Sequence, residues 1–201
     1  MQVKINWFGL VGGITTIIVI ISSLFIPWWQ LTVGDSLAKA NVSPLNTNFD
    51  LIGNSFTIPL IWAINLGSIL YLAAAGIVML IYSVKPTKLY SKRLLGFSYR
   101  KPLYYSVFFV VGIVAFTLIV NSIFKLSIPV IGSAKAALPS SMTQGININV
   151  MLSSTFLWPF WLAVVSAGFC IAARFYHTKI NPTTLSAIAP TASVPSTSAA
   201  T

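Results

Sequence analysis

The hydrophobic positions of this chain are gathered into four long uninterrupted runs. They cover residues 7–27, 58–82, 104–124 and 152–173, and none contains Asp, Glu, Lys, Arg or His. Each run reaches the roughly 20 residues that a helix needs to cross about 30 Å of hydrocarbon at about 1.5 Å per residue. The pattern predicts an all-α integral membrane protein, in which residues 1–180 form a bundle of four transmembrane helices.

The basic residues that flank these runs predict the orientation of the chain in the membrane. Nine of them fall at the two ends or between the second and third runs: Lys4, Lys85, Lys88, Lys92, Arg93, Arg100, Lys101, Arg174 and Lys179. Only Lys39, Lys125 and Lys135 fall on the opposite side. Cytoplasmic loops carry an excess of Lys and Arg, so both termini and a basic loop over residues 83–103 are predicted in the cytoplasm of a multi-pass cell-membrane protein. Residues 181–201, rich in Ser, Thr, Ala and Pro, are predicted to form a flexible cytoplasmic tail.

Two stretches between the runs, residues 28–57 and 125–151, are predicted to be outer loops. The first contains β-prone segments at residues 29–33, 49–52 and 54–58. The second ends in residues 145–150, which alternate apolar and polar with the period of a strand. We therefore expect a small antiparallel sheet outside the membrane that draws strands from both loops.

Two further features fit the predicted exterior. The sequon Asn41-Val42-Ser43 lies in the first outer loop and makes Asn41 a candidate for N-glycosylation. Five tryptophans lie near the outer ends of the runs: Trp28, Trp29, Trp62, Trp158 and Trp161. Amphipathic indole rings favour the headgroup level, so we expect these five side chains to anchor the helices at the outer interface.

Composition leaves little for catalysis. Hydrophobic residues make up 56% of the chain and charged residues only 7%, so the outer surface must face lipid rather than water. The single Cys170 cannot form an intramolecular disulfide, and the single His177 cannot build a metal or haem site alone. We therefore expect no enzymatic activity, no cofactor and no metal. The net charge of +10 is explained by membrane orientation, so nucleic acid is not an expected partner.

A few polar residues interrupt the outer halves of the runs. Asn65 and Ser68 lie in the second run, and Thr117 and Asn121 lie one turn apart in the third. They are expected to form an interhelical hydrogen-bonded layer. The alternative is that they line a solute-binding or water-filled vestibule, as in a small transporter or channel.

Small residues also recur at the spacing of close helix packing. The pairs are Gly9 and Gly13, Ala63 and Gly67, Ala163 and Ala167, and Gly168 and Ala172. Residues four apart lie on the same face of a helix, and without large side chains they let two helices approach closely.

The layout resembles the four-span claudin-type arrangement. Both predicted termini are inside, a larger outer loop follows the Trp28-Trp29 end of the first run, and a smaller outer loop follows the third. The resemblance covers topology across about 170 residues. The chain departs from that family's tryptophan–cysteine signature, because its first outer loop contains no cysteine. The resemblance therefore implies the arrangement of spans and loops, and no particular partner.

These features favour a non-enzymatic structural or interaction component that acts through its outer loops, within an oligomer or a larger membrane assembly. The expected partners are the lipid bilayer and either another protein or a second copy of the chain. The alternatives are an accessory subunit of a membrane energy-converting or transport complex, and a small transporter or channel.

Overall fold

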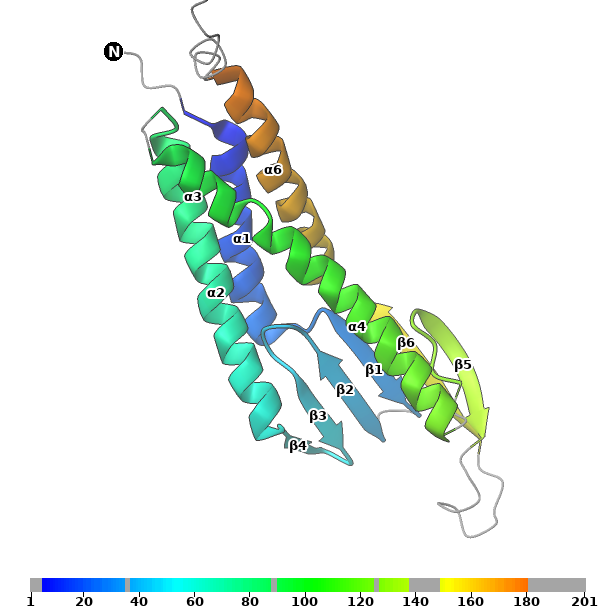
Figure 1. Ribbon diagram of the computed structural model, residues 1–201. Helices are drawn as coiled ribbons and strands as arrows, with labels where there is room; N and C mark the ends of the chain where they lie inside the picture. Colours follow the sequence, from blue (N-terminus) through cyan, green and yellow to red (C-terminus); the bar gives the residue numbers. More distant parts are fainter. Residues whose placement is uncertain (1–4, 35–36, 88–89, 125–126, 138–148, 181–201) are drawn as a thin grey trace, which may run out of the picture.

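The computed structural model describes residues 5–34, 37–87, 90–124, 127–137 and 149–180. They form four long helices, one short helix and one sheet (Figure 1). The helices are α1 (Trp7–Phe25), α2 (Pro59–Val84), α3 (Ser91–Ser98), α4 (Lys101–Phe124) and α6 (Trp158–Ile180). The strands are β1 (Trp29–Val33), β2 (Ala38–Val42), β3 (Asn48–Leu51), β4 (Asn54–Phe56), β5 (Gly132–Ala137) and β6 (Asn149–Phe156). The predicted tail over residues 181–201 lies outside the described residues.

Four helical segments in the described part of the chain are long and apolar enough to cross a membrane by length and composition. Each corresponds to one of the runs seen in the sequence. Local chemistry explains where the helices begin: the Asn6 side chain accepts the amide of Gly9 and caps α1, and Pro59 occupies the first turn of α2. Proline suits that position because its missing N–H would have no helical partner there.

The prediction of an all-α fold is wrong, because six antiparallel strands form one sheet in the order β4-β3-β2-β1-β6-β5. The expectation that both outer loops contribute strands is confirmed: β1 and β6 pair at the centre, with Leu31 opposite Ser154. The sheet is larger than expected. Strand β2 and the whole of β5 were not among the predicted segments, since their small and polar residues give little β signal. Residues 145–148 of the predicted alternating segment lie outside the described residues.

The fourth span begins later than predicted. Residues 152–156 belong to β6, and the helix begins at Trp158. The hydrophobic pattern predicted β6 and α6 as one span because Leu157, the residue between them, is also apolar. The period distinguishes them: Val150, Leu152 and Ser154 are buried while the residues between them are exposed, as on a strand with one covered face.

The third span and the basic loop also differ from the prediction. Much of the predicted loop is helical, as the end of α2, the helix α3 and the start of α4. Proline has no N–H, so Pro102 cannot donate to the carbonyl of Ser98, four residues earlier, and a proline ring crowds that carbonyl in a continuous helix. Helix α3 ends at Ser98. Beyond this break α4 diverges from α2 and runs along the sheet (Figure 1). The four-helix bundle is therefore incomplete: α1, α2 and α6 pack together, and α4 meets α6 and covers the sheet.

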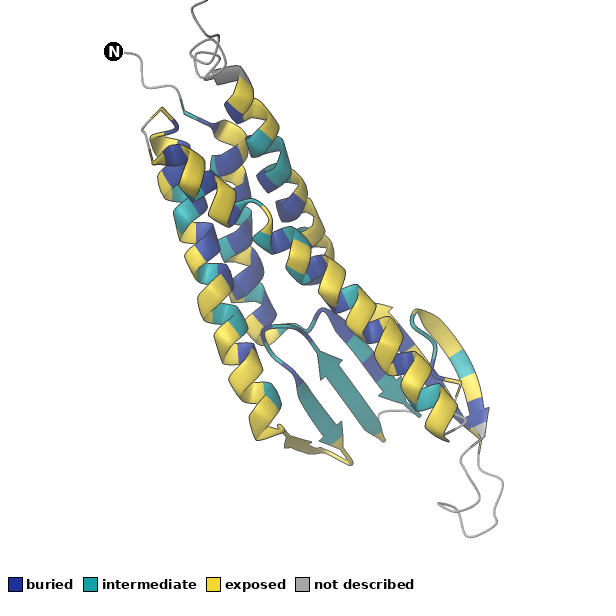
Figure 2. Cartoon of the chain, in the orientation of Figure 1, coloured by how far each residue is buried: buried dark blue, intermediate teal, exposed yellow. Residues whose placement is uncertain are grey.

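The sheet shares its apolar core with α1, α4 and α6, while α2 and α3 contribute to two smaller clusters. Figure 2 shows buried residues along the contacting faces of α1, α2 and α6, and exposed residues along the outer surfaces of α2 and α4. The largest side chains in the core are Trp28 and Trp29, both with 0% exposure. Trp28 packs edge-on against Phe109 of α4 and Phe160 of α6, with centroid distances of 5.2 and 6.0 Å. The adjacent residues Trp28 and Trp29 therefore join the sheet to the helices.

Candidate functional site

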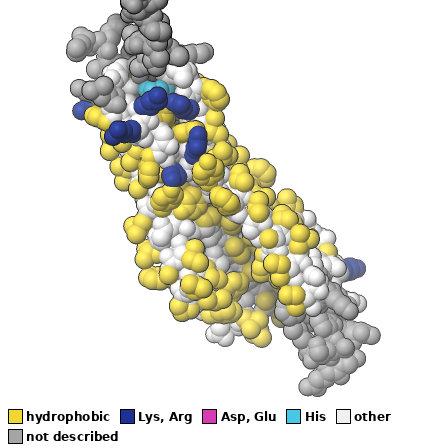
Figure 3. All heavy atoms as spheres, in the orientation of Figure 1, with side chains coloured by type: hydrophobic (Ala, Val, Ile, Leu, Met, Phe, Trp, Pro, Cys, Tyr) yellow, Lys and Arg dark blue, Asp and Glu magenta, His cyan; other side chains and the backbone are white. Residues whose placement is uncertain are grey.

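The two ends of the molecule carry different chemistry. Lys85 and the residues Lys92 and Arg93 of α3 lie toward one end, which we call the basic end. Figure 3 shows Lys and Arg side chains gathered there, while the visible surface farther along the helices carries hydrophobic side chains and uncharged atoms. The strands occupy the opposite end, which we call the sheet end (Figure 1).

One face of the sheet is a hydrogen-bonded polar surface. The Gln30 side chain donates to the side-chain oxygen Oδ1 of Asn41 at 2.7 Å. The side-chain nitrogen of Asn41 donates to Oδ1 of Asn48 at 2.8 Å and to the Asp50 carboxylate at 3.1 Å. Ser55 donates to the same carboxylate. These bonds link β1, β2, β3 and β4 through side chains as well as backbone. They also engage the amide nitrogen of Asn41, to which a glycan would be attached, and the glycosylation of Asn41 stays a prediction.

The outer edge of this sheet is the β3–β4 hairpin. Its two central residues, Ile52 and Gly53, have φ values of +49° and +81°. Two positive φ angles in a two-residue loop are typical of a type I′ turn, in which Asn-Gly is the favoured pair. An isoleucine in the left-handed region is strained, because its branched Cβ crowds the backbone. Ile52 is nevertheless 76% exposed, so packing within the described chain does not offset the strain.

The hairpin tip forms part of an apolar patch at the sheet end. The amide of Ile52 donates to the carbonyl of Leu37 at 2.9 Å, which joins the two hairpins of the first outer loop. Leu37, Leu51, Ile52 and Phe56 are all exposed. We call these four residues the tip patch.

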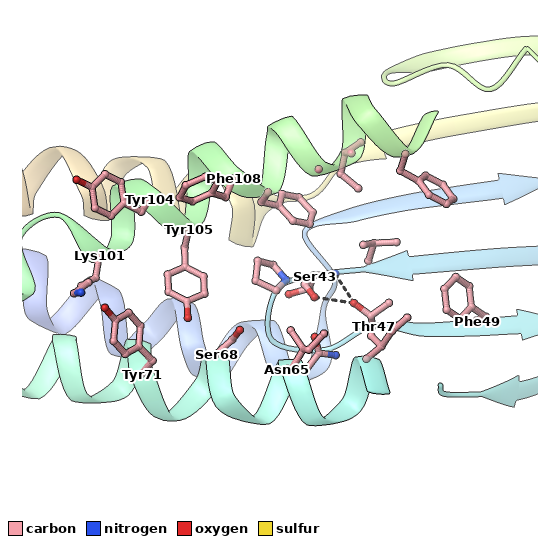
Figure 4. A pocket seen from close by; sticks show the side chains of 18 residues that line it. Ser43, Thr47, Phe49, Asn65, Ser68, Tyr71, Lys101, Tyr104, Tyr105 and Phe108 are labelled. Carbon is pink, nitrogen blue, oxygen red and sulfur yellow. Dashed lines mark hydrogen bonds between the residues drawn. The ribbon is translucent and has the colours of Figure 1, made fainter. Parts of the chain in front are cut away.

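A groove of about 650 Å³ separates α2 from α4. It exists because α4 diverges from α2 after the break at Pro102. Figure 4 shows Lys101 and Tyr71 at one end, Tyr105 and Ser68 farther along, and Asn65, Thr47 and Phe49 toward the sheet. Most of the groove wall is hydrocarbon or aromatic ring.

Asn65 and Asn121 do not form the predicted interhelical layer. In the amide orientation that satisfies both of its polar atoms, Asn65 donates to the Pro44 carbonyl at 3.2 Å and accepts from the Thr47 amide at 2.8 Å. Asn121 bonds both backbone groups of Ile128, at 3.0 and 2.8 Å. A side-chain amide has one donor group and one acceptor, so it matches a backbone carbonyl and N–H together. Each asparagine therefore fixes a connecting segment to its helix.

The other two members of the predicted layer have local roles. Thr117 donates to the carbonyl of Val114 in its own helix at 2.9 Å, and Ser68 lies on the groove wall. The side-chain bonds that do join helices lie nearer the basic end. Thr16 of α1 and Ser166 of α6 are 2.8 Å apart at their hydroxyl oxygens.

A buried polar cluster at the basic end was not predicted from the sequence. Asn6 donates to the Tyr82 hydroxyl at 2.8 Å and to the Ala173 carbonyl at 3.0 Å. The Tyr82 hydroxyl also lies 2.9 Å from Nδ1 of His177. The cluster ties together α1, α2 and α6. Its members are far apart in the sequence, and the available signal was only that each is a polar residue at the end of an apolar run.

The predicted tryptophan anchors fall into two groups. Trp28 and Trp29 are fully buried, so their assignment to the lipid interface is wrong. Their indole N–H groups donate inside the protein, to Ser23 at 2.7 Å and to the Val130 carbonyl at 2.8 Å. Trp62, Trp158 and Trp161 are exposed, and their role as anchors stays a prediction.

No protein-family model matches the chain, and a search of curated proteins finds no similar sequence. The described residues hold no group of three or more His, Cys, Asp or Glu side chains placed to bind a metal ion. Two features remain as candidate functional sites: the tip patch at the sheet end, and the groove between α2 and α4.

Proposed function

We propose that this chain is a non-enzymatic multi-pass membrane protein that binds a protein partner outside the membrane through the tip patch. Both termini and the basic end would lie in the cytoplasm, as the distribution of Lys and Arg favours. The sheet end would then face the exterior, where a soluble domain or the outer part of a membrane complex is accessible.

The observation that carries this proposal is the exposed, strained Ile52. Strained backbone conformations cluster at functional sites, so the strain at Ile52 points to a role for the hairpin tip. Asparagine or glycine at residue 52 would relieve the strain. An isoleucine that projects into solvent beside Leu51 and Phe56 instead provides apolar contact area for a partner.

The surroundings of the tip patch support the same function. Strand β4 is the terminal strand of the sheet, so among the described residues no strand lies beside one row of its backbone groups. All three of its residues are exposed. Exposed edges of this kind accept an added strand or segment from a partner.

Site-directed photo-crosslinking tests the proposal. The native Cys170 is buried, so a cysteine introduced at the surface provides the principal site for a maleimide crosslinker. Ser55→Cys places the crosslinker beside the tip patch, and Ser133→Cys is the matched control, because Ser133 is exposed on β5 at the opposite edge of the same sheet. In native membranes we expect a defined adduct from Ser55→Cys, lost when Ile52→Asn is added, and no adduct from Ser133→Cys. Only uncrosslinked chain from Ser55→Cys, or an adduct that Ile52→Asn leaves unchanged, would contradict the proposal.

The identity of the crosslinked protein separates the remaining alternatives. A differently tagged second copy indicates self-association. A redox or transport subunit indicates an accessory role in a larger membrane complex.

A further inference from the structure

The groove between α2 and α4 has the form of a site for one amphiphilic molecule. Its volume of about 650 Å³ lies within the roughly 300–1,000 Å³ typical of small-molecule sites. A helix with side chains is about 10 Å wide, so the same space would hold only about one and a half helical turns of a neighbouring protein. The groove lies between two helices that are each apolar enough to span a membrane, so its open side would face lipid.

One end of the groove carries a fixed positive charge. Lys101 is the first residue of α4 and is half-buried. Its ammonium lies 4.4 Å from the ring centroid of Tyr71 and 4.9 Å from that of Phe97. Cation–π contacts of this kind hold the ammonium at the groove and leave its N–H groups available to an anion. Figure 4 also shows the Tyr105 hydroxyl directed across the groove toward α2, close to this end.

Lys101 marks the boundary between the basic and the apolar surface. From Pro102 to Phe124, α4 contains no charged residue, and neither does α2 from Pro59 to Val84. The basic residues of α3 lie on the other side of the boundary. A boundary between Lys and Arg on one side and exposed hydrocarbon on the other is where lipid headgroups lie.

The geometry points to a binding site for one anionic membrane phospholipid. The Lys101 ammonium, with the Tyr71 and Tyr105 hydroxyls near it, binds the phosphate, and an acyl chain extends along the groove past Ser68 toward Phe49. This inference does not depend on the proposed partner at the tip patch. The groove reaches the sheet at Phe49, which stacks on Phe56 of the tip patch at a centroid distance of 5.6 Å, so the two sites are tested with separate variants.

Native mass spectrometry of the detergent-solubilised full-length chain tests the headgroup contact. The probes are phosphatidylglycerol and phosphatidylcholine with identical acyl chains. We expect Lys101→Gln to weaken phosphatidylglycerol binding about fivefold, the factor expected for one basic residue near an anionic headgroup. Phosphatidylcholine carries the same phosphate, but its choline cation offsets the attraction to Lys101, so its binding should weaken much less. Lys101→Arg should retain the preference for phosphatidylglycerol, and Lys92→Gln, on the exposed side of α3, is the matched control that should retain it as well.

A second pair of variants tests the acyl chain in the groove. Gly112 lines the groove, and a Cβ added there would meet no atom within 4 Å, so Gly112→Phe should place its ring in the groove. We expect it to weaken binding of both lipids more than tenfold. Gly168→Phe is the matched control, because Gly168 is equally open but lies on the exposed surface of α6. Unchanged phosphatidylglycerol binding in Lys101→Gln, unchanged lipid binding in Gly112→Phe, or a dimer mass that only Gly112→Phe abolishes would each overturn the proposal.

Discussion

The basic end and the sheet end are both built from long apolar helices, but these helices pack in different ways at the two ends. At the basic end α1 fits closely against α2 and α6, because Gly9, Gly12 and Gly13 lie at the contacts. At the sheet end α2 and α4 are separated by a groove, and Gly112 faces open space. Hydrophobicity therefore brings a segment to the membrane, while small residues and buried hydrogen bonds decide which segments pack together.

The largest expected effect is at the junction between the two regions. Trp28→Ala should lower the free energy of unfolding by about 3–5 kcal/mol, because it removes a fully buried indole that contacts both α4 and α6. Thermal unfolding in detergent should show a fall of roughly 10 °C in Tm. Trp62→Ala is the control, since Trp62 is 60% exposed and should change stability by less than about 0.5 kcal/mol. Equal losses in the two variants would refute the burial of Trp28.

The polar cluster at the basic end should give the next largest effect. Asn6→Ala removes the cap of α1 and two buried hydrogen bonds, and we expect a loss of about 2–3 kcal/mol in denaturant unfolding. Asn48→Ala is the comparison at the sheet end. Asn48 accepts one bond from Asn41 on the half-exposed polar face, so its loss should be about 0.5–1 kcal/mol. The contrast between the ends fails if Asn48→Ala is the more damaging of the two.

Helix contact can be tested with the same substitution at two glycines. A Cβ on Gly12 would lie 2.9 Å from the Cys170 sulfur and 3.1 Å from its backbone nitrogen. Gly12→Ala should therefore destabilise the chain by about 1–2 kcal/mol, despite the better helix propensity of alanine. Gly112→Ala has no such contact and should stabilise by about 0.5–1 kcal/mol. Opposite signs in thermal unfolding would confirm the comparison, and a loss at both positions would show that α4 packs more closely than described.

The smallest expected effect is a gain in stability at the sheet end. Ile52→Asn should raise the free energy of unfolding by about 1 kcal/mol, since asparagine adopts the left-handed region with little strain. The same change should reduce crosslinking at the tip patch. Ile52→Val keeps the branched Cβ and should leave stability near its original value. A destabilised Ile52→Asn would show that the Ile52 side chain contributes to the fold rather than to binding.

The sequence predicted the elements better than their arrangement. Four apolar runs and the β-prone segments around Trp29 and Phe49 led correctly to long helices and to strands from both outer loops. Local signals failed where tertiary contacts decide. Hydropathy could not separate Leu152, in a strand, from the helix that begins at Trp158, and the position of Trp28 near a helix end looked the same for a lipid anchor as for a core residue.

The candidate functional sites were harder to predict than the helices and strands, because they depend on how these elements are arranged in space. The groove exists because α4 turns away after Pro102, and no periodicity within α2 or α4 indicates that divergence. The role of Asn65 could not be read from its position in a span either, because its partners Pro44 and Thr47 come from a connecting segment whose fold was unknown. The tip patch carried one local signal, the Ile52-Gly53 pair where a type I′ turn favours Asn-Gly.

The pairing of β1 with β6 has a consequence for biogenesis. Strand β1 follows the first helix, whereas β6 immediately precedes the last, so more than a hundred residues are synthesised between the two. Until β6 and α6 emerge, one edge of β1 lacks its neighbouring strand and Trp28 lacks its contact with Phe160. A contact between such distant segments forms slowly and leaves adhesive surface exposed in the meantime. The sheet therefore closes last, and truncation before β6 should produce chains that aggregate through the open edge of β1.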